Sequence, residues 1–278
     1  MLVRPKMCPG DEHLNGHAHS APIPPSARPF RLRSRAKCIK QNAENVARWK
    51  KHGSGFACYC EDLESCTSAD HCGKSYCAVC TGLFRRKILP AAVSVVAAPA
   101  QIGPPKLKFA TIYIAEIATG QLSSVDLKKK NHALRMDLRR AGMASTVVFG
   151  NVEVAYIART KRWLLHAHLI LRDPSAASLA LLDDKAWKAG GDGALKIEKV
   201  TNPLRQFSYC LKFPLYHRPG KGGARRARAY SIPKAALSEL LAWLSRHDPK
   251  EFVFLQRLRW AGRKLALAPT KVRSDRGA

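Results

Sequence analysis

The chain has 278 residues, of which 48 are Lys or Arg and 20 are Asp or Glu, so its formal net charge is +28. This length suffices for one ordinary domain with smaller attachments, and the charge favours an acidic polymer such as DNA as the partner. The longest apolar stretch, residues 88–100, is too short to span a membrane and is interrupted by Pro90 and Pro99. The first 20 residues lack the apolar core of a signal peptide. We therefore expect a cytoplasmic protein that binds no membrane.

Changes in composition divide the chain into four segments. Residues 1–45 are rich in Pro, Arg, His and Ser and show neither helical nor strand periodicity. We expect a disordered basic arm there, which either contacts phosphates or is a solvated tail. The other three segments are a zinc-binding module with a linker helix at 46–105, a main domain at 106–217, and a basic loop with a C-terminal helical segment at 218–278.

Six cysteines lie close together between Cys58 and Cys80. In a reducing compartment such a cluster favours zinc binding over disulfides. The two-residue gap between Cys77 and Cys80 suits two thiolates on one zinc ion, and Cys72 is near enough to join them. We take Cys60 as the fourth ligand. The alternatives for that position are Cys58, Cys66 and His71.

The main domain alternates β-branched or aromatic runs with helical patterns. The predicted strands cover residues 109–114, 151–157, 163–171 and 194–200, and the predicted helices 123–141, 176–188 and 203–213. Ser123 is the expected cap of the first helix and Gly142 its stop. A helix through Leu237 and Leu244, a short strand at 252–255 and a basic tail follow. This order predicts an α+β domain with an antiparallel sheet that helices cover on one face.

His166 and His168 are two residues apart on a predicted strand, so both side chains point to one face of the sheet. A polar turn joins this strand to the preceding one. If Arg159 pairs with Arg162 across that turn, Glu153 lies opposite His168 on the same face. Two imidazoles and a carboxylate suit a divalent metal that keeps positions open for a substrate. The alternative is that both histidines only pack within the sheet.

The helix at 203–213 carries a tyrosine on its polar side. Arg205, Tyr209 and Lys212 recur there at i, i+4 and i+7. The apolar stripe on the other side consists of Leu204, Phe207 and Leu211. Phenol is a weak nucleophile at neutral pH because its reference pKa is about 10, but nearby cations favour phenolate. The pattern indicates Tyr209 as a nucleophile for phosphoryl transfer, or else as a surface aromatic on a basic helix.

Basic side chains in three places are expected to contact DNA backbone. One group follows the cysteines directly, one lies at the end of the predicted helix 123–141, and one residue precedes Tyr209 by one helical turn. Solvated helix faces are the alternative reading of these charges. The residues concerned are Arg85, Arg86, Lys87, Arg139, Arg140 and Arg205.

Three of these motifs resemble, in order and approximate spacing, the motifs of the HUH endonuclease superfamily. The three are the strand 111–114, the His-hydrophobe-His pair at 166–168, and the Tyr-Cys-Leu-Lys run at 209–212. The upstream cysteine knuckle at 71–80, with the basic run after it, looks like the plasmid rolling-circle replication initiator (Rep) branch. The resemblance covers about residues 58–215.

The resemblance implies an RRM-like HUH fold for the nuclease domain 106–217. It implies that Tyr209 attacks a phosphodiester of a single-stranded or hairpin DNA origin, leaving a 5′-phosphotyrosine and a free 3′-hydroxyl. His166 and His168 would hold Mg²⁺ or Mn²⁺, and Lys212 would position phosphate or metal. A bacterial, plasmid- or mobile-element-encoded protein that works with a host helicase or polymerase is expected. The alternatives are a transposase or relaxase of the same superfamily and a non-catalytic zinc-dependent nucleic-acid-binding protein.

Overall fold

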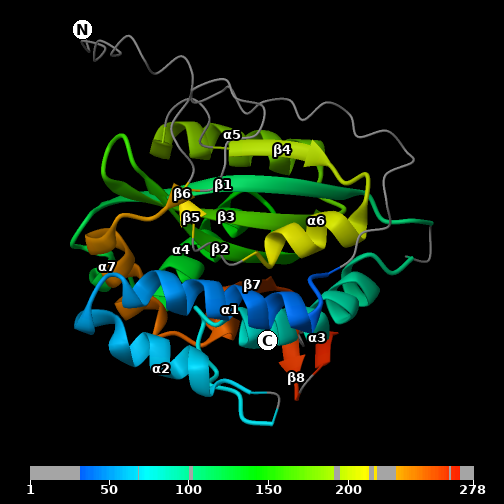
Figure 1. Cartoon of the computed structure of the whole chain (residues 1–278). Helices are drawn as coiled ribbons and strands as arrows, with labels where there is room; N and C mark the ends of the chain where they lie inside the picture. The colour runs from blue at the N-terminus through cyan, green and yellow to red at the C-terminus, as the bar shows by residue number, and fades with distance from the viewer. Residues whose placement is uncertain are drawn as a thin grey trace, which may run out of the picture.

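The computed structural model describes residues 32–67, 69–99, 103–190, 195–212, 216–217, 230–262 and 264–269. Within these ranges the chain forms an α+β fold built on one five-stranded sheet (Figure 1). The expected arm at 1–45 lies outside the described residues as far as residue 31, and the expected basic loop lies outside them at 218–229. No described helix combines the length and apolarity that crossing a membrane requires.

The predicted antiparallel sheet is confirmed. Its strand order is β4-β1-β3-β2-β7, and all four neighbouring pairs are antiparallel. The strands are β1 (Leu107–Ala118), β2 (Val147–Ile157), β3 (Arg162–Arg172), β4 (Leu195–Lys199) and β7 (Val253–Gln256). β3 is the central strand, and the unbroken burial of residues 167–171 fits a strand that is covered on both faces.

The register of the β2-β3 hairpin differs by two residues from the predicted one. Glu153 lies opposite His166, and Asn151 lies opposite His168. The predicted pairing of Glu153 with His168 is therefore wrong. Side chains alternate between the two faces with a period of two. A shift of two residues therefore leaves Glu153, His166 and His168 on the expected face.

The length of the hairpin loop explains this difference. Ile157 pairs with Arg162, which leaves a four-residue loop. The predicted pairing of Arg159 with Arg162 would leave Thr160 and Lys161 as a two-residue loop. Such loops usually need positive φ angles, which a β-branched threonine strongly disfavours. In the actual loop only Lys161 has a positive φ, of 51°.

Helices cover both faces of the sheet, so the prediction of helices on one face is wrong. One face packs against α3 (Ala78–Val96) and α6 (Pro203–Cys210), through residues that include Phe149. The other face packs against α4 (Leu127–Arg140) and α5 (Ala176–Gly190). In Figure 1, α6 lies in front of the sheet and α4 behind it.

The first described helix, α1 (Arg35–Lys50), falls partly in the segment expected to be disordered. Residues 35–45 are helical, so that expectation is wrong for them. Ser34 caps the helix by accepting a hydrogen bond from a backbone N–H of the first turn. The buried side of the helix includes Asn42 and Asn45. These polar residues interrupt the apolar periodicity by which a helix is recognised.

The helix α4 begins later than predicted. Asp126 caps it, because its side chain accepts a hydrogen bond from the Lys129 N–H. Ser123, the predicted cap, lies in the short 3-10 helix η3 (Leu122–Ser124) instead. Gly142 follows the helix with a φ of +75°, which confirms the predicted stop.

The C-terminal part contains the predicted helix and strand, and two further strands where a basic tail was expected. The additional strands β8 and β9 pair with each other and pack against α3. The remaining elements are η2 (Ser54–Phe56), α2 (Ala57–Ser65), β5 (Tyr216–His217), β6 (Tyr230–Ser231), α7 (Lys234–Leu244), η4 (Pro249–Phe252), β8 (Leu258–Ala261) and β9 (Lys264–Leu267).

Candidate functional site

Three side chains of the β2-β3 hairpin meet on the sheet face that carries α6. The Nε2 atoms of His166 and His168 are 3.1 Å apart. Oε2 of Glu153 lies 3.1 Å from Nε2 of His168 and 3.7 Å from Nε2 of His166. The structure therefore brings one carboxylate and two imidazoles to a single point, and we call these three residues the hairpin triad.

The spacing and chemistry of the hairpin triad fit a divalent cation. Nitrogen and oxygen ligands lie about 2.0–2.2 Å from such an ion, which puts neighbouring ligand atoms about 3.0–3.5 Å apart. Glu153 is 4% exposed and His168 5%, so solvent does not compete strongly for these atoms. Two imidazoles and one carboxylate form a mixed donor set that accepts Mn²⁺, Mg²⁺ or related ions.

A lysine forms an ion pair with the carboxylate of the triad. Nζ of Lys212 lies 3.1 Å from Oε1 of Glu153. Burial raises the pKa of Glu153, but His168, Lys212 and His166 outweigh burial and lower this pKa to about 2. Burial lowers the pKa of His166 to about 4, against the opposing effect of Glu153. At neutral pH the carboxylate is thus charged and His166 is neutral, the states in which these groups bind a metal.

Tyr209 on α6 lies directly beside the triad. Its ring centroid is 4.8 Å from that of His168, with the two rings at 69°, and 5.9 Å from that of Phe109. Nζ of Lys212 lies 4.9 Å from the centre of the tyrosine ring. The tyrosine is 36% exposed. A phenol, an ammonium group and the metal-ligating candidates therefore share one partly open site.

Local sequence explains why α6 begins where it does. Asn202 caps the helix by accepting a hydrogen bond from the Arg205 N–H, and Pro203 follows in the first turn. Phe207 then anchors the helix on the sheet by stacking on Phe149, with ring centroids 5.6 Å apart. This anchor holds α6 over β3, with Tyr209 two residues further along the helix.

The polar and apolar sides of α6 differ in detail from the prediction. Phe207 and Leu211 are fully buried as expected, but Leu204 is 41% exposed. The helix ends at Cys210 rather than continuing to Phe213, and Phe213 lies outside the described residues. The lysine that contacts Glu153 therefore comes from the chain just after the helix.

Two residues beside His168 were not singled out from the sequence. Oγ1 of Thr111 on β1 lies 3.0 Å from Nδ1 of His168. Asn151 on β2 is 1% exposed, and its Oδ1 has no hydrogen-bond partner among the described residues. Asn151 lies two residues before Glu153, so the two side chains share a face of the sheet. This spacing in the sequence could have indicated that Asn151 lies beside the site. Both residues lie beside the hairpin triad.

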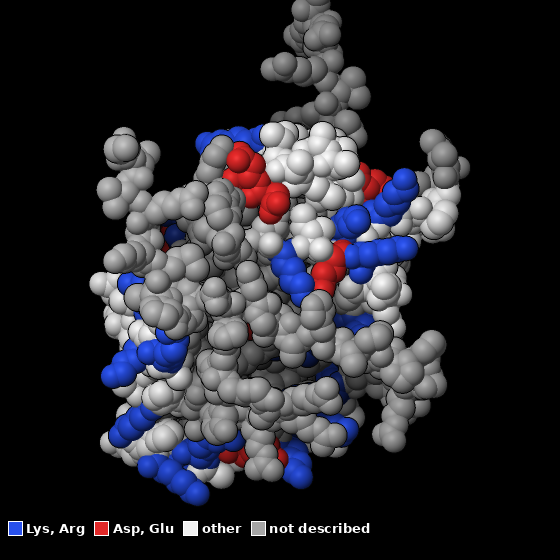
Figure 2. All heavy atoms as spheres, turned by 90° about the horizontal axis from the view of Figure 1, so that it is seen from above, with Lys and Arg blue, Asp and Glu red and all other residues white. Residues whose placement is uncertain are grey.

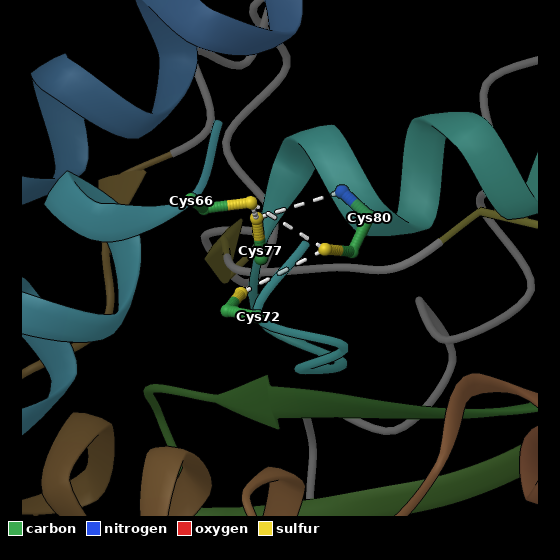
Figure 3. A group of neighbouring side chains, drawn as sticks. All are labelled: Cys66, Cys72, Cys77 and Cys80. Atoms are coloured by element: carbon green, nitrogen blue, oxygen red, sulfur yellow. Dashed lines mark hydrogen bonds between the residues drawn. The ribbon is translucent and has the colours of Figure 1, made fainter. Parts of the chain in front are cut away.

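A second group of candidate ligands consists of four cysteines (Figure 3). Sγ of Cys66 lies 3.5 Å from Sγ of Cys77 and 3.6 Å from Sγ of Cys80. Sγ of Cys72 lies 3.7 Å from Sγ of Cys80. Zinc–sulfur bonds of about 2.3 Å in a tetrahedral site separate the sulfurs by about 3.8 Å. The four thiols therefore have the spacing of a structural zinc site.

The cysteine group joins three parts of the N-terminal module. Cys66 follows α2, Cys72 lies in the next loop, and Cys77 and Cys80 lie at the start of α3, as Figure 3 shows. Sγ of Cys77 accepts hydrogen bonds from Nδ2 of Asn42 and from the Cys80 N–H. Contacts with Cys72 and Cys80 lower the pKa of Cys77, which favours a thiolate at this position.

Cys66 occupies the place in this group for which the sequence favoured Cys60. Cys60 lies within α2 and is 2% exposed, with its thiol directed toward the Val46 carbonyl oxygen, 4.0 Å away. The helical backbone turns this side chain toward α1 and away from the other thiols. Cys58 lies exposed on the same helix, and His71 is exposed in the following loop.

Two of the basic residues expected to contact DNA have hydrogen-bond partners in distant parts of the chain. Nη2 of Arg85 donates to the carbonyl oxygen and to Oγ of Ser208, at 2.9 Å and 2.8 Å. Burial lowers the pKa of Arg85, and its guanidinium connects α3 with α6. Nη1 of Arg86 donates to the carbonyl oxygen of Arg33 at 3.2 Å. Arg85 therefore has a structural role.

The other four basic residues are exposed, in two different regions. Arg205 lies one helical turn before Tyr209, and Lys87 lies on α3. Arg139 and Arg140 lie at the end of α4, which packs on the opposite face of the sheet from the hairpin triad. Figure 2 shows Lys and Arg side chains along much of the rim of one face of the molecule, with acidic side chains in small groups between them.

Comparisons with known proteins returned no match, whether with family models, with curated proteins or with solved structures. The chemistry and geometry of the two residue groups therefore carry the functional argument, together with the order of the sequence motifs.

Proposed function

We propose that this protein is a metal-dependent enzyme that nicks DNA and transfers the cut strand to Tyr209. The observation that carries the proposal is the position of this tyrosine, whose ring centroid lies 4.8 Å from that of His168. On the same face, Glu153 lies within contact distance of both His166 and Lys212. A nucleophile, a candidate metal site and a positive charge are what phosphoryl transfer to tyrosine requires.

In the proposed reaction the hydroxyl oxygen of Tyr209 forms a bond to phosphorus while the bond from phosphorus to the 3′ oxygen breaks. The tyrosine loses its proton, and the departing 3′ oxygen gains one. The products are a 5′-phosphotyrosine and a free 3′-hydroxyl. One phosphodiester is exchanged for another, so the strand can be rejoined without an external energy source.

The residues around Tyr209 have distinct tasks in this proposal. Glu153, His166 and His168 would hold Mg²⁺ or Mn²⁺, which when bound polarises the phosphate and stabilises its developing charge. Lys212, whose Nζ lies 4.9 Å from the centre of the tyrosine ring, attracts the phosphate toward Tyr209. Arg205, exposed one turn before the tyrosine, is placed to contact the DNA backbone.

The order of motifs supports initiation of rolling-circle replication as the biological process. A cysteine group precedes the His-hydrophobe-His pair and the tyrosine helix, as in the plasmid Rep proteins that the sequence resembles. The cysteine group would hold structural zinc at the start of α3, and Arg85 on that helix is hydrogen-bonded to α6. The substrate proposed is a single-stranded or hairpin origin.

Replacing both histidines tests the metal-dependent part of the proposal. A His166→Ala/His168→Ala variant, incubated with a random library of single-stranded DNA and Mn²⁺, is expected to lose cleavage because two of three ligands are missing. Its zinc content is expected to equal that of the wild type. Lys40→Ala, on the exposed side of α1, serves as a control that retains cleavage.

Cleavage by the double variant at the wild-type rate would remove the hairpin triad from the reaction. Loss of zinc from the double variant would show that the zinc and the catalytic metal had been assigned to the wrong groups. Both quantities can be measured on one preparation, by denaturing gel and by elemental analysis.

A further inference from the structure

A hydroxyl group from the neighbouring strand contacts one of the two histidines. Thr111 on β1 lies directly opposite His168 on β3, and its Oγ1 is 3.0 Å from Nδ1 of the histidine. The other ring nitrogen, Nε2, lies 3.1 Å from both Glu153 and His166. The two nitrogens of His168 therefore have separate surroundings: one faces the candidate metal position and the other faces a hydroxyl.

Packing fixes the plane of the His168 ring but not the position of its proton. Phe109 stacks on this ring, with centroids 5.7 Å apart and planes at 18°, and Tyr209 contacts it edge-on. Aromatic contacts of this kind do not distinguish the two tautomers of a neutral imidazole. Polar partners decide which nitrogen carries the proton.

We infer that Thr111 is a positioning residue, which holds His168 in the tautomer that can bind a cation. A cation takes the lone pair of Nε2, so the proton must then lie on Nδ1 and needs an acceptor. The threonine oxygen is placed to accept it. This inference rests on the proposed function, because it requires a cation at the hairpin triad.

A hydroxyl suits this position better than a carboxylate would. The hydroxyl both donates and accepts, so Thr111 can also donate to Nδ1 in the metal-free protein, with the imidazole proton on Nε2, which faces Glu153 and His166. Binding a cation then requires the imidazole proton to move from Nε2 to Nδ1, while the contact with Thr111 stays in place. A neutral partner also adds no further negative charge beside Glu153.

The test compares Thr111→Val, which keeps the branched shape without the hydroxyl, with Thr111→Ser, which keeps the hydroxyl. Calorimetric titration of the full-length, zinc-loaded protein with Mn²⁺ is made without DNA. Thr111→Val is expected to bind Mn²⁺ about 10–100-fold more weakly, the usual effect of losing a partner of a metal-ligating histidine. Thr111→Ser is expected to bind as the wild type does.

Tyr113→Phe is the matched control. Tyr113 lies on the same strand, at the position opposite His166, so this variant removes a hydroxyl from β1 two residues after Thr111. Its affinity for Mn²⁺ is expected to be unchanged. Nitrogen NMR of labelled histidine in the Mg²⁺-loaded wild type is expected to show His168 protonated on Nδ1, a signature that a merely structural role for Thr111 would not require.

Thr111→Val that binds Mn²⁺ as tightly as the wild type would overturn the inference, as would His168 protonated on Nε2 in the Mg²⁺-loaded protein. Failure of the proposed function looks different. A wild type that binds Mn²⁺ more tightly than Thr111→Val, yet never cleaves DNA, keeps the positioning role and rejects the nuclease. If cleavage does occur, excess Mn²⁺ is expected to restore the maximal rate of Thr111→Val.

Discussion

Glu153 is both a candidate metal ligand and the ion-pair partner of Lys212. It is 4% exposed, and its two oxygens face different partners: His168 on one side and Lys212 on the other. A buried carboxylate is costly unless it is paired. Here His168, Lys212 and His166 outweigh the effect of burial and lower its pKa to about 2, from a reference value of 4.5, so the ionised form stabilises the fold.

Glu153→Gln is expected to destabilise the metal-free protein in a pH-dependent way. Because the folded pKa of Glu153 lies below the unfolded one, its stabilising effect is complete above about pH 4.5 and is lost as the pH falls toward 2. At pH 7 the free energy of unfolding should fall by about 3 kcal/mol. Denaturant titrations of both proteins at pH 7 and pH 3 measure this difference, and an equal difference at both values would contradict the account.

At the residue scale, strand alternation was enough to predict which side chains share a face. It placed Glu153, His166 and His168 together even though the register was shifted by two residues, because the period of a strand is also two. Thr111 could not be predicted as a partner of His168. The two are 57 residues apart, and local patterns do not specify which distant strands pair.

At the scale of elements, the position of α6 depends on a half-buried arginine of α3, Arg85. Arg85→Met removes two hydrogen bonds to Ser208 while keeping a long apolar side chain. Hydrogen bonds from charged groups contribute about 1.5–3 kcal/mol, so we expect a loss of roughly 2 kcal/mol in the free energy of unfolding. DNA cleavage should also fall, because α6 carries Tyr209.

Lys87→Ala is the matched control on the same helix. Lys87 is exposed, so its replacement should change stability by less than about 0.5 kcal/mol. If Lys87 contacts a phosphate group, the Lys87→Ala variant should show both a lower affinity for DNA and a weaker dependence of that affinity on salt. An Arg85→Met protein as stable as Lys87→Ala would show that the link between α3 and α6 is unimportant.

Elements with clear caps and stops were predictable, and the errors have local causes. Gly142 ends α4 as expected, but the predicted cap, Ser123, is wrong, and Asp126 caps the helix instead. Ser and Asp are both good capping residues and lie close together here, so the sequence alone does not distinguish them. The helix α1 escaped prediction because Asn42 and Asn45 occupy its buried side. These asparagines form hydrogen bonds with particular side chains. The periodicity of apolar residues in the sequence does not reveal such contacts.

At the scale of the whole molecule, the cysteine group holds the N-terminal module together. Cys66→Ala is expected to lose zinc and to lower the melting temperature, because the thiol follows α2 and meets two cysteines of α3. Cys60→Ala should retain zinc, since that thiol lies between α1 and α2. Elemental analysis and thermal denaturation of the full-length variants measure both effects.

The opposite pattern, with zinc lost in Cys60→Ala and retained in Cys66→Ala, would show that the ligand set is the one the sequence favoured. Cys58→Ala provides the control for an exposed thiol, and it should match the wild type in zinc content and melting temperature.

The class of fold was predictable, but its layering was not. Alternating strand and helix patterns indicated an α+β domain with an antiparallel sheet, as observed. The unbroken burial of residues 148–154 on β2 shows that both faces are covered. Which helix covers which face depends on packing between distant segments, as with α3 and α6 on one side and α4 on the other.

The most direct test of the central claim is to locate the covalent bond between protein and DNA. The full-length protein is incubated with Mn²⁺ and a random single-stranded DNA library, digested, and analysed by mass spectrometry. A 5′-nucleotide is expected on the peptide that contains Tyr209, and Tyr209→Phe is expected to bind the same DNA without forming any adduct. An adduct on another residue, or one that persists in Tyr209→Phe, would contradict the account.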